Sequence, residues 1–173
     1  MARISIKEVD GMKKISKRIL SDSRGVTAVE FALIMPFFFL LLFAIIDFGW
    51  YFYSQHTIQF ATREGTRLAL VGVQLKDKDG NEMSREDSII KTIQDNAALA
   101  VDPAALQISI YPVAAGYSDP EGWEESQNPG SGGDYMRVRV RYTYHFLTPL
   151  IGNFFPSGAN VIQAQALYRN ELF

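Results

Sequence analysis

The chain has 173 residues, 47 % of them hydrophobic, with a formal net charge of −2 and no cysteine. This length is enough for one compact domain with an appendage, and without cysteine the fold cannot rely on disulfides. The charge is unevenly distributed, since residues 1–25 hold seven Lys or Arg and three acids, whereas residues 26–173 hold ten bases and 16 acids. A net acidic main domain argues against nucleic acid as the primary partner.

The first long feature is an apolar run at residues 31–46, FALIMPFFFLLLFAII, in which 12 of 16 residues are Phe, Leu or Ile. With residues 26–29 and Glu30 it forms a 21-residue stretch, which as an α-helix is about 31 Å long, close to one hydrocarbon core. The large apolar residues favour insertion by about 4 to 7 kcal/mol, whereas a carboxylate at mid-membrane costs about 2.5 to 3.5 kcal/mol. The run therefore predicts a membrane-spanning helix even with Glu30 inside it.

The flanks of this helix predict its orientation and the division of the chain. Basic flanks stay in the cytoplasm, and the run is followed by DFGWYFY at residues 47–53, an aromatic belt rather than the small-residue site of a cleaved signal peptide. We interpret Asp47 as an interfacial residue at the outer membrane face, with a specific ion-pair role as the alternative. The division is then residues 1–25 as a basic cytoplasmic leader, 26–50 as the transmembrane helix and 51–173 as an extracytoplasmic domain.

Helical spacing continues beyond the membrane. One narrow stripe recurs at spacings of three, four and seven residues, formed by Tyr51, Ile58, Ala61, Gly65, Leu68 and Gly72. We therefore predict one helix over residues 26–71, with a kink or local loosening at Pro36.

A polar stretch at residues 76–87 follows, with a turn signal at Asp79-Gly80. Asp77, Asp79 and Asn81 resemble the start of a calcium loop, but the glycine stands at the fourth position and Ser88 at the twelfth, so an exposed turn is favoured.

The last part of the chain predicts one short helix and three strands. Ser84 and Asp87 resemble a capping box, followed by a helix at residues 85–99 that ends before Asp102-Pro103. Apolar and polar residues alternate in the three predicted strands, which indicates an antiparallel sheet with one buried face: 106–113, 135–147 and 161–169. The fold class is therefore α+β, a long N-terminal helix whose outer half packs on a small antiparallel sheet of about three strands, with Ala164 and Ala166 allowing close approach.

Two loops receive less specific predictions. Residues 116–134 are rich in Gly, Pro, Ser and acids and are interpreted as a long exposed loop. Its acids could pair with the arginines on the polar face of the second strand, Arg137, Arg139 and Arg141, the candidate partners being Asp119, Glu121, Glu124 and Glu125. Residues 147–158, LTPLIGNFFPSG, are unusually apolar, and are either core or an exposed patch that meets the membrane or another subunit.

No motif indicates an enzyme, a metal site or a cofactor. His56 and His145 are far apart in the sequence and there is no cysteine to complete a metal site. Nucleophile elbow, phosphate loop and H-E-x-x-H motifs are all missing, so a hydrolase has no support.

The motifs RGVTAVEFALIMPFFFLLLFAIIDFG (24–49) and ATREGTRLAL (61–70) resemble the TadE-like family of pilin-like proteins. This family belongs to tight-adherence (Tad) pili, a branch of the type IV pilus superfamily. The resemblance covers about 47 residues, 24–70, with Thr62 and Thr66 at positions that are alanine-like in the family. The C-terminal region resembles the family only loosely, through its strands and the ending Arg169-Asn170-Glu171.

The resemblance implies a minor pilin or pseudopilin of the inner membrane that a prepilin peptidase cleaves between Gly25 and Val26. Glu30 would then be the fifth mature residue and, with Phe31, would serve subunit pairing and assembly. Cleavage creates an ammonium group at Val26, and the same group of a neighbouring subunit would pair with Glu30. The expected partners are the peptidase and the other pilin and pseudopilin subunits of a Tad pilus used for adhesion.

Two alternatives remain. Arg63, Glu64 and Arg67 form either a solvated helix face with internal pairing or a contact with partner subunits. The whole chain could instead be an uncleaved, signal-anchored surface protein whose outer domain binds a ligand or partner.

Overall fold

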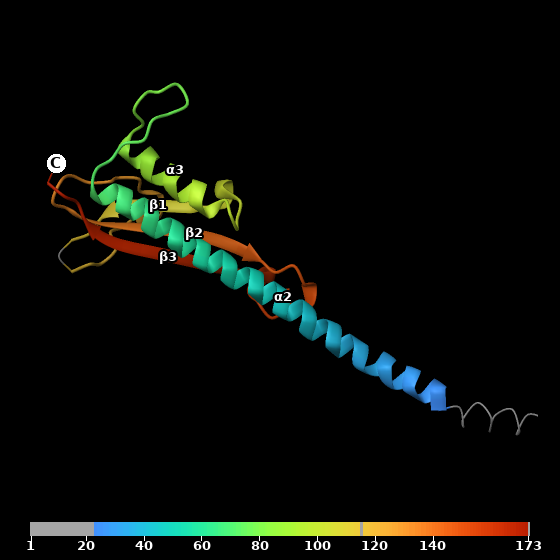
Figure 1. The fold of residues 1–173 in the computed structure, drawn as a ribbon. Helices are drawn as coiled ribbons and strands as arrows, with labels where there is room; N and C mark the ends of the chain where they lie inside the picture. The colour runs from blue at the N-terminus through green and yellow to red at the C-terminus, as the bar shows by residue number, and fades with distance from the viewer. Residues whose placement is uncertain (1–22, 115, 173) are drawn as a thin grey trace, which may run out of the picture. The chain divides into compact units, whose positions relative to one another are not determined.

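The computed structural model describes residues 23–114 and 116–172, so most of the predicted leader lies outside the described residues. The chain divides into two compact units, residues 1–45 and residues 46–173. One helix, α2 (Ser23–Leu70), runs from the first unit into the second (Figure 1). The second unit also contains α3 (Arg85–Ala97), β1 (Gln107–Pro112), β2 (Tyr135–His145), α4 (Pro149–Gly152), β3 (Ala159–Arg169) and the short 3₁₀ turns η1 (Pro103–Ala105), η2 (Trp123–Glu125) and η3 (Pro156–Gly158).

The predicted long helix is confirmed. It continues through Pro36 without interruption and ends one residue before the predicted end. From Gly25 to Ile46 the side chains are exposed, apart from Met35 and Ala44, which are half-buried. No other described residue buries this half of the helix, and the helix is long and apolar enough to cross a membrane.

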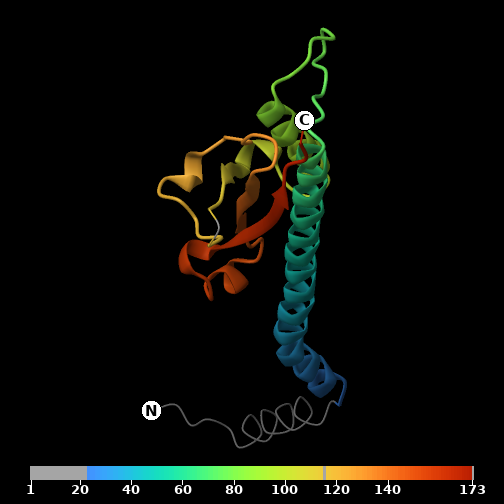
Figure 2. The ribbon, with the colours of Figure 1, turned by 90° about the vertical axis from the view of Figure 1, so that its left-hand side faces the viewer.

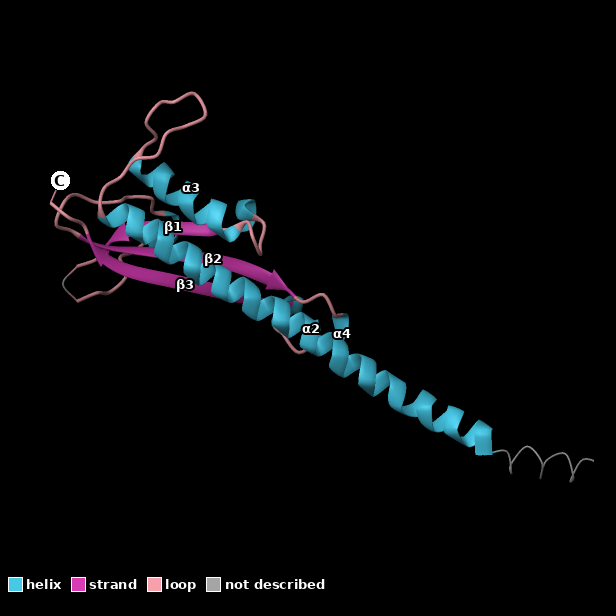
Figure 3. Ribbon diagram, viewed as in Figure 1, coloured by secondary structure: helices cyan, strands magenta, loops and turns pink. Residues whose placement is uncertain are grey.

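The three predicted strands are also confirmed, as an antiparallel sheet in the order β1-β2-β3 (Figure 3). Val140 in the central strand lies opposite Ile108 of β1 and Ala164 of β3, so the apolar residues of all three strands share one face. β3 begins two residues earlier than predicted and β2 ends two residues earlier.

The core of the second unit lies between this apolar face, α3 and the outer half of α2. Ile58 and Ala61 of α2, Ile93 of α3, and Val138 and Val140 of β2 are all fully buried within it. Figure 2 shows the sheet and α3 beside the outer half of α2, with residues 75–83 extending beyond that end of the helix. Within the predicted polar stretch, residues 76–82 form an exposed hairpin closed by the Lys76–Glu82 bridge, whereas residues 85–87 already belong to α3.

The α2 face that packs on the core consists largely of small and hydroxyl-bearing residues, with the fully buried Ile58 as a large apolar member. Thr57, Thr62 and Thr66 each donate their hydroxyl to the carbonyl oxygen four residues earlier, at 2.6–2.9 Å. These local bonds satisfy the hydroxyl groups inside the helix itself, so the face can be buried without further polar partners for the three threonines.

The closest approach of two helices occurs at Gly65. A methyl group added there would overlap Cγ1 of Ile93, lie 2.9 Å from its Cδ1 and lie 3.3 Å from the carbonyl oxygen of Ile89. Ile93 is fully buried and has little room to move, so the glycine lets α3 pack directly on the α2 backbone.

The end of α2, the start of α3 and the C-terminal segment are joined by polar contacts. Arg85 donates to the carbonyl oxygen of Ala69 at 2.7 Å and to the amide oxygen of Asn170 at 2.6 Å. The Asn170 amide group donates in turn to the carbonyl oxygens of Pro129 and Ser131. The buried Asn170 therefore connects β3, the loop before β2 and the last carbonyl groups of α2, which a helix end otherwise leaves unpaired.

The predicted loop at residues 116–134 is confirmed as mostly exposed, and it also contacts the sheet. Ile110 of β1 exchanges backbone hydrogen bonds of 2.8 Å with Ser126 and Asn128. The loop covers the second face of β1, where Ser109 and Tyr111 are buried. For this strand the sheet therefore has two covered faces rather than one.

Gly65→Ala should destabilise the domain by about 1–3 kcal/mol, because the added methyl group forces Ile93 and α3 outward. Urea unfolding of the full-length protein in detergent, followed by near-UV circular dichroism, measures the effect. Gly49→Ala is the matched control, since a methyl group there meets nothing within 4 Å and alanine should stabilise the helix by about 0.5–1 kcal/mol. Equal unfolding free energies for the two variants would contradict the close-packing argument.

Candidate functional site

The predicted processing and pairing residues lie in the first two turns of α2. Gly25, Val26 and Glu30 are exposed, as is Phe31, whose side chain is 61 % accessible. The structure thus presents these residues together on the uncovered end of one helix. Gly25 is a poor helix former, which lowers the cost of opening this first turn.

Glu30 forms no ion pair with any other residue in the part of the chain that the structure describes. Its neighbours Val29 and Phe31 are apolar and more than half exposed. A carboxylate in such a surface is costly to place in lipid unless it finds a cation or hydrogen-bond donors.

Asp47 has a role inside the domain that was not part of its prediction as an interfacial residue at the outer membrane face. Its side chain is only 1 % accessible. One carboxylate oxygen accepts hydrogen bonds from the Tyr144 hydroxyl at 3.2 Å and the Leu147 amide at 3.1 Å, and the other accepts from the Thr148 amide at 2.9 Å. Asp47 therefore holds the chain between β2 and α4 against α2, and its partners are hydrogen-bond donors rather than a cation.

An aromatic cluster surrounds this contact. The Phe146 ring stacks on Phe155 with centroids 4.3 Å apart, and it also meets Phe48, Tyr51 and Tyr144 at 5.3–5.9 Å. Such pairs contribute beyond simple area burial. The Asp47 hydrogen bonds and this cluster fix residues 144–155 to one turn of α2.

Burial, and then the negative charge and hydrogen bond of Asp47, raise the pKa of the Tyr144 hydroxyl to about 12. Tyr144 consequently remains a neutral donor to Asp47 throughout the physiological pH range.

The residues predicted as possible contacts with partner subunits, Arg63, Glu64 and Arg67, do not all border the same cavity. Glu64 and Arg67 form an ion pair of 3.0 Å on the helix surface, with Arg67 80 % accessible. They border a cavity of about 350 Å³ with Leu68 and Val71, whereas Arg63 borders a separate cavity of about 300 Å³ lined by three glutamines. Of the two alternatives, internal pairing is present for Arg67, and among the described residues Arg63 forms no ion pair.

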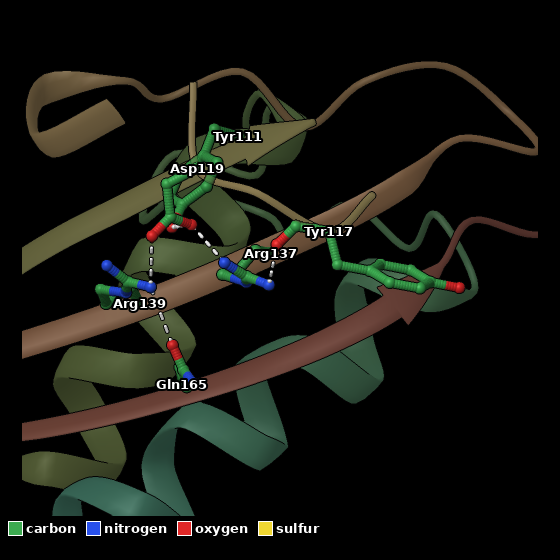
Figure 4. A network of polar contacts seen from close by, with 6 residues as sticks. All are labelled: Tyr111, Tyr117, Asp119, Arg137, Arg139 and Gln165. Carbon is green, nitrogen blue, oxygen red and sulfur yellow. Dashed lines mark hydrogen bonds and ion pairs between the residues drawn. The ribbon is translucent and has the colours of Figure 1, made fainter. Parts of the chain in front are cut away.

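A polar network fixes the covering loop to the sheet (Figure 4). Asp119 accepts hydrogen bonds from Arg137, from Arg139 at 2.9 Å and from the Tyr111 hydroxyl at 2.8 Å. Trp123 adds a ring face 4.1 Å from the Arg139 guanidinium carbon and 4.9 Å from that of Arg141. Among the four acids predicted to pair with these arginines, the described residues contain ion pairs only to Asp119.

The Asp119 carboxyl has a pKa below its usual value. Burial acts to raise this pKa, but the hydrogen bonds from Tyr111, Arg139 and Arg137 outweigh that effect. The Tyr111 hydroxyl has a raised pKa because of its burial and its bond to Asp119. The network is therefore built around an ionised carboxylate and a neutral phenol.

The calcium-like spacing at the hairpin has a local explanation. One oxygen of Asp77 accepts hydrogen bonds of 2.9 Å from the amides of both Asp79 and Asn81. The carboxylate thus stabilises its own turn. Within residues 23–114 and 116–172 there is no group of three acidic, histidine or cysteine side chains arranged to hold a metal ion.

Three functional features were missed by sequence reasoning, namely the internal role of Asp47, the ring of Trp123 over two arginines, and the Arg85–Asn170 connection. A signal for the first was present, because Asp47 precedes Tyr51 by four residues and so falls on the buried stripe. Trp123 and Asn170 carry no comparable local pattern.

A helix that is apolar in its first half and packed on a small antiparallel sheet in its second half defines an α+β protein. Residues 25–67 match the model of a family described as TadE-like protein. This match confirms the resemblance predicted from the motifs, and it indicates a Tad pilus-associated protein of the minor-pilin type. No curated protein and no solved structure matches the chain.

Asp47→Ala should destabilise the domain by about 1.5–3 kcal/mol, because it removes a charged acceptor and leaves three donors without their partner. Asp47→Asn, which keeps one carbonyl oxygen, should lose less. Thermal and urea unfolding of the full-length protein in detergent measures both. Asp95→Ala is the control, since the Lys91–Asp95 pair is exposed and its loss should cost less than about 0.5 kcal/mol. An Asp47→Ala variant with an unchanged free energy of unfolding would show that the contact contributes no stability.

Asp119→Asn should cost about 1–3 kcal/mol through the two arginine contacts and should also change the acid response. Because the pKa of Asp119 is lower in the folded state, its ionised carboxylate contributes its full stabilisation at pH values above the ordinary pKa of 3.8. This contribution to the free energy of unfolding is lost as the pH falls through the lowered pKa of the folded state. The variant should therefore show a shallower stability loss below about pH 4, measured by urea unfolding between pH 2.5 and 7. Glu121→Gln, at an exposed acid of the same loop, should retain the wild-type profile.

Proposed function

We propose that the protein is a minor pilin or pseudopilin, processed by a prepilin peptidase after Gly25, that joins or primes assembly of a Tad-type pilus used for adhesion. The observation that carries the proposal is the TadE-like match, which begins at Gly25 and spans the apolar helix and Glu30. The seven basic residues before Val26 support a leader that stays in the cytoplasm.

The proposed division of the chain follows the same reasoning. Residues 1–25 are the leader, 26–50 the membrane and assembly helix, and 51–173 the domain outside the inner membrane. The aromatic residues after Ile46, with Trp50 and Tyr53 about half exposed, suit the outer interface of the membrane.

Cleavage would solve the electrostatic problem of Glu30. The new N-terminal ammonium of Val26 has an ordinary pKa near 8, so it is mostly charged at neutral pH. Within one helix, residues 26 and 30 lie about 6 Å apart along the axis, but the ammonium of a neighbouring subunit can approach the carboxylate directly. An axial offset between subunits would leave both charges unpaired in apolar surroundings, so the pair also sets register.

The exposed surface of α2 supports a second role for the helix after it leaves the membrane. Large apolar side chains point outward on all sides between Phe31 and Ile46, which suits lipid first and neighbouring pilin helices afterwards. Phe31, beside Glu30, would pack against the adjoining helix and shield the ion pair from water. Arg63, Glu64 and Arg67 are proposed as contacts of the outer domain with partner subunits.

Mass spectrometry of the protein recovered from pilus-producing cells tests the processing step. We expect a mature N-terminus at Val26. Intact residues 1–25 on the functional protein would instead favour the alternative, a signal-anchored surface protein with a binding domain.

Glu30→Gln tests the pairing step. We expect normal cleavage at Gly25–Val26, because the scissile bond is unchanged, but loss of crosslinking to pilin subunits and a severe loss of pili. Glu82→Gln, in the exposed hairpin, is the matched control and should assemble normally. Unchanged assembly by the Glu30→Gln variant would refute the pairing argument, while circular dichroism reports whether the domain is still folded.

A further inference from the structure

The segment between β2 and β3 carries three large apolar side chains that point away from the core. Leu147 is 72 % accessible, Leu150 48 % and Phe154 80 %. These three residues are called the apolar tip. There is no charged residue from Phe146 to Gly158, so nothing in this segment opposes contact with an apolar phase.

The rest of the segment is anchored rather than loose. Asp47 accepts hydrogen bonds from the amides of Leu147 and Thr148, and Ile151 is buried. Phe146 and Phe155 stack on each other, and Phe146 also contacts Phe48 and Tyr51. Both the core and the exposed-patch interpretations of residues 147–158 are thus correct, for different side chains.

This anchoring sets the level of the apolar tip along α2. Asp47 follows directly after the uncharged run of residues 31–46, so the tip is tied to the turn of the helix at which the apolar run ends. On that turn and the next, Ile46, Trp50 and Tyr53 are also about half exposed. Two segments distant in the sequence therefore present apolar and aromatic side chains at one level of the second unit.

We propose that the apolar tip inserts into the outer leaflet of the membrane, at the boundary between headgroups and acyl chains. Apolar side chains presented at that boundary are drawn into it to a depth of about 5–10 Å, and Trp and Tyr favour the same level. The inference rests on the membrane span in the proposed function. It adds a second membrane contact, which limits how the outer domain turns about the helix and so presents a constant face to incoming subunits.

Lipid fits the apolar tip better than a second copy of the chain because the segment that carries the tip is hydrogen-bonded to Asp47, the residue directly after the uncharged run. The tip carries no charged group that would fix the orientation of a protein partner, whereas insertion into a lipid boundary needs none. Protein–protein contact remains a distinct outcome of the experiment.

The absence of cysteine allows single labelled cysteines to be introduced into the full-length protein. A nitroxide on Leu150→Cys or Phe154→Cys, in proteoliposomes of phosphatidylethanolamine and phosphatidylglycerol, reports access to oxygen from lipid and to a nickel chelate from water. We expect both sites to favour oxygen. Leu167→Cys is the matched control, since Leu167 is 45 % exposed on β3 and should favour the nickel chelate.

Leu41→Cys, in the apolar run, separates failure of this inference from failure of the proposed function. If the Leu41 label favours oxygen but the tip labels behave like the Leu167 label, the inference is overturned and the span stands. If the Leu41 label is also in water, both are overturned. Tip labels that are shielded from both reagents and show spin–spin coupling between copies would assign the tip to subunit contact, which also overturns lipid insertion.

A charge variant gives an independent check. With Leu147→Glu and Phe154→Glu introduced together, the Leu150 label should lose its preference for oxygen, while near-UV circular dichroism stays unchanged because both side chains point outward. Retention of the oxygen preference would overturn the proposal.

Discussion

The structure depends on one constraint, which is that a single helix has to suit two different surroundings along its length. From Phe31 to Ile46 the α2 side chains are apolar, and nearly all of them are exposed among the described residues. From Asp47 onward one side faces a protein core and the other faces solvent. The change occurs at one residue, and the carboxylate at that residue has its hydrogen-bond donors supplied by the sheet and the segment after it.

The outer half of α2 shows how the same helix can be buried with few large apolar side chains. Its core face consists largely of alanine, glycine, serine and threonine, and the threonine hydroxyls are satisfied within the helix. Small residues let the sheet and α3 approach the helix backbone closely, as Gly65 allows at Ile93. Most of the large apolar side chains of the core come instead from the sheet and α3, where Val138, Val140 and Ile93 are fully buried.

The parts of the fold that were predictable are those in which the local pattern and the final surroundings agree. Alternation in residues 135–145 predicted β2 and its buried face, because each apolar residue there does face the core. The covering loop was predicted only in part. Its acids were expected to pair with the arginines of β2, but the selection of Asp119 and the position of the Trp123 ring depend on arginines about 15 to 20 residues later in the chain. A composition rich in glycine and proline describes the flexibility of the isolated segment, not the contacts that fix it.

Asp47 shows the same difference between what a local pattern predicts and what distant contacts determine. Its aromatic neighbours indicated a membrane interface, and that argument considered residue types alone. Its spacing of four residues from Tyr51 places it on the buried stripe of the helix, and in the structure its side chain is buried. A polar residue on a buried stripe needs partners from elsewhere in the fold, and those partners, Tyr144, Leu147 and Thr148, are about 100 residues away, beyond what a local pattern reveals.

The two carboxylates of α2 are therefore a useful pair to compare. Both interrupt an otherwise apolar stretch, and both would be costly if left without partners. Asp47 has three donors within its own domain, so its charge is explained by one chain. Glu30 has no ion-pair partner among the described residues, and its surroundings on the helix are apolar. A charge that the fold satisfies serves the fold, whereas the lack of an ion pair for Glu30 among the described residues supports the proposed contact with a group outside the chain. This contrast, rather than the presence of a glutamate alone, is what makes the N-terminal end of α2 the place to look for another subunit.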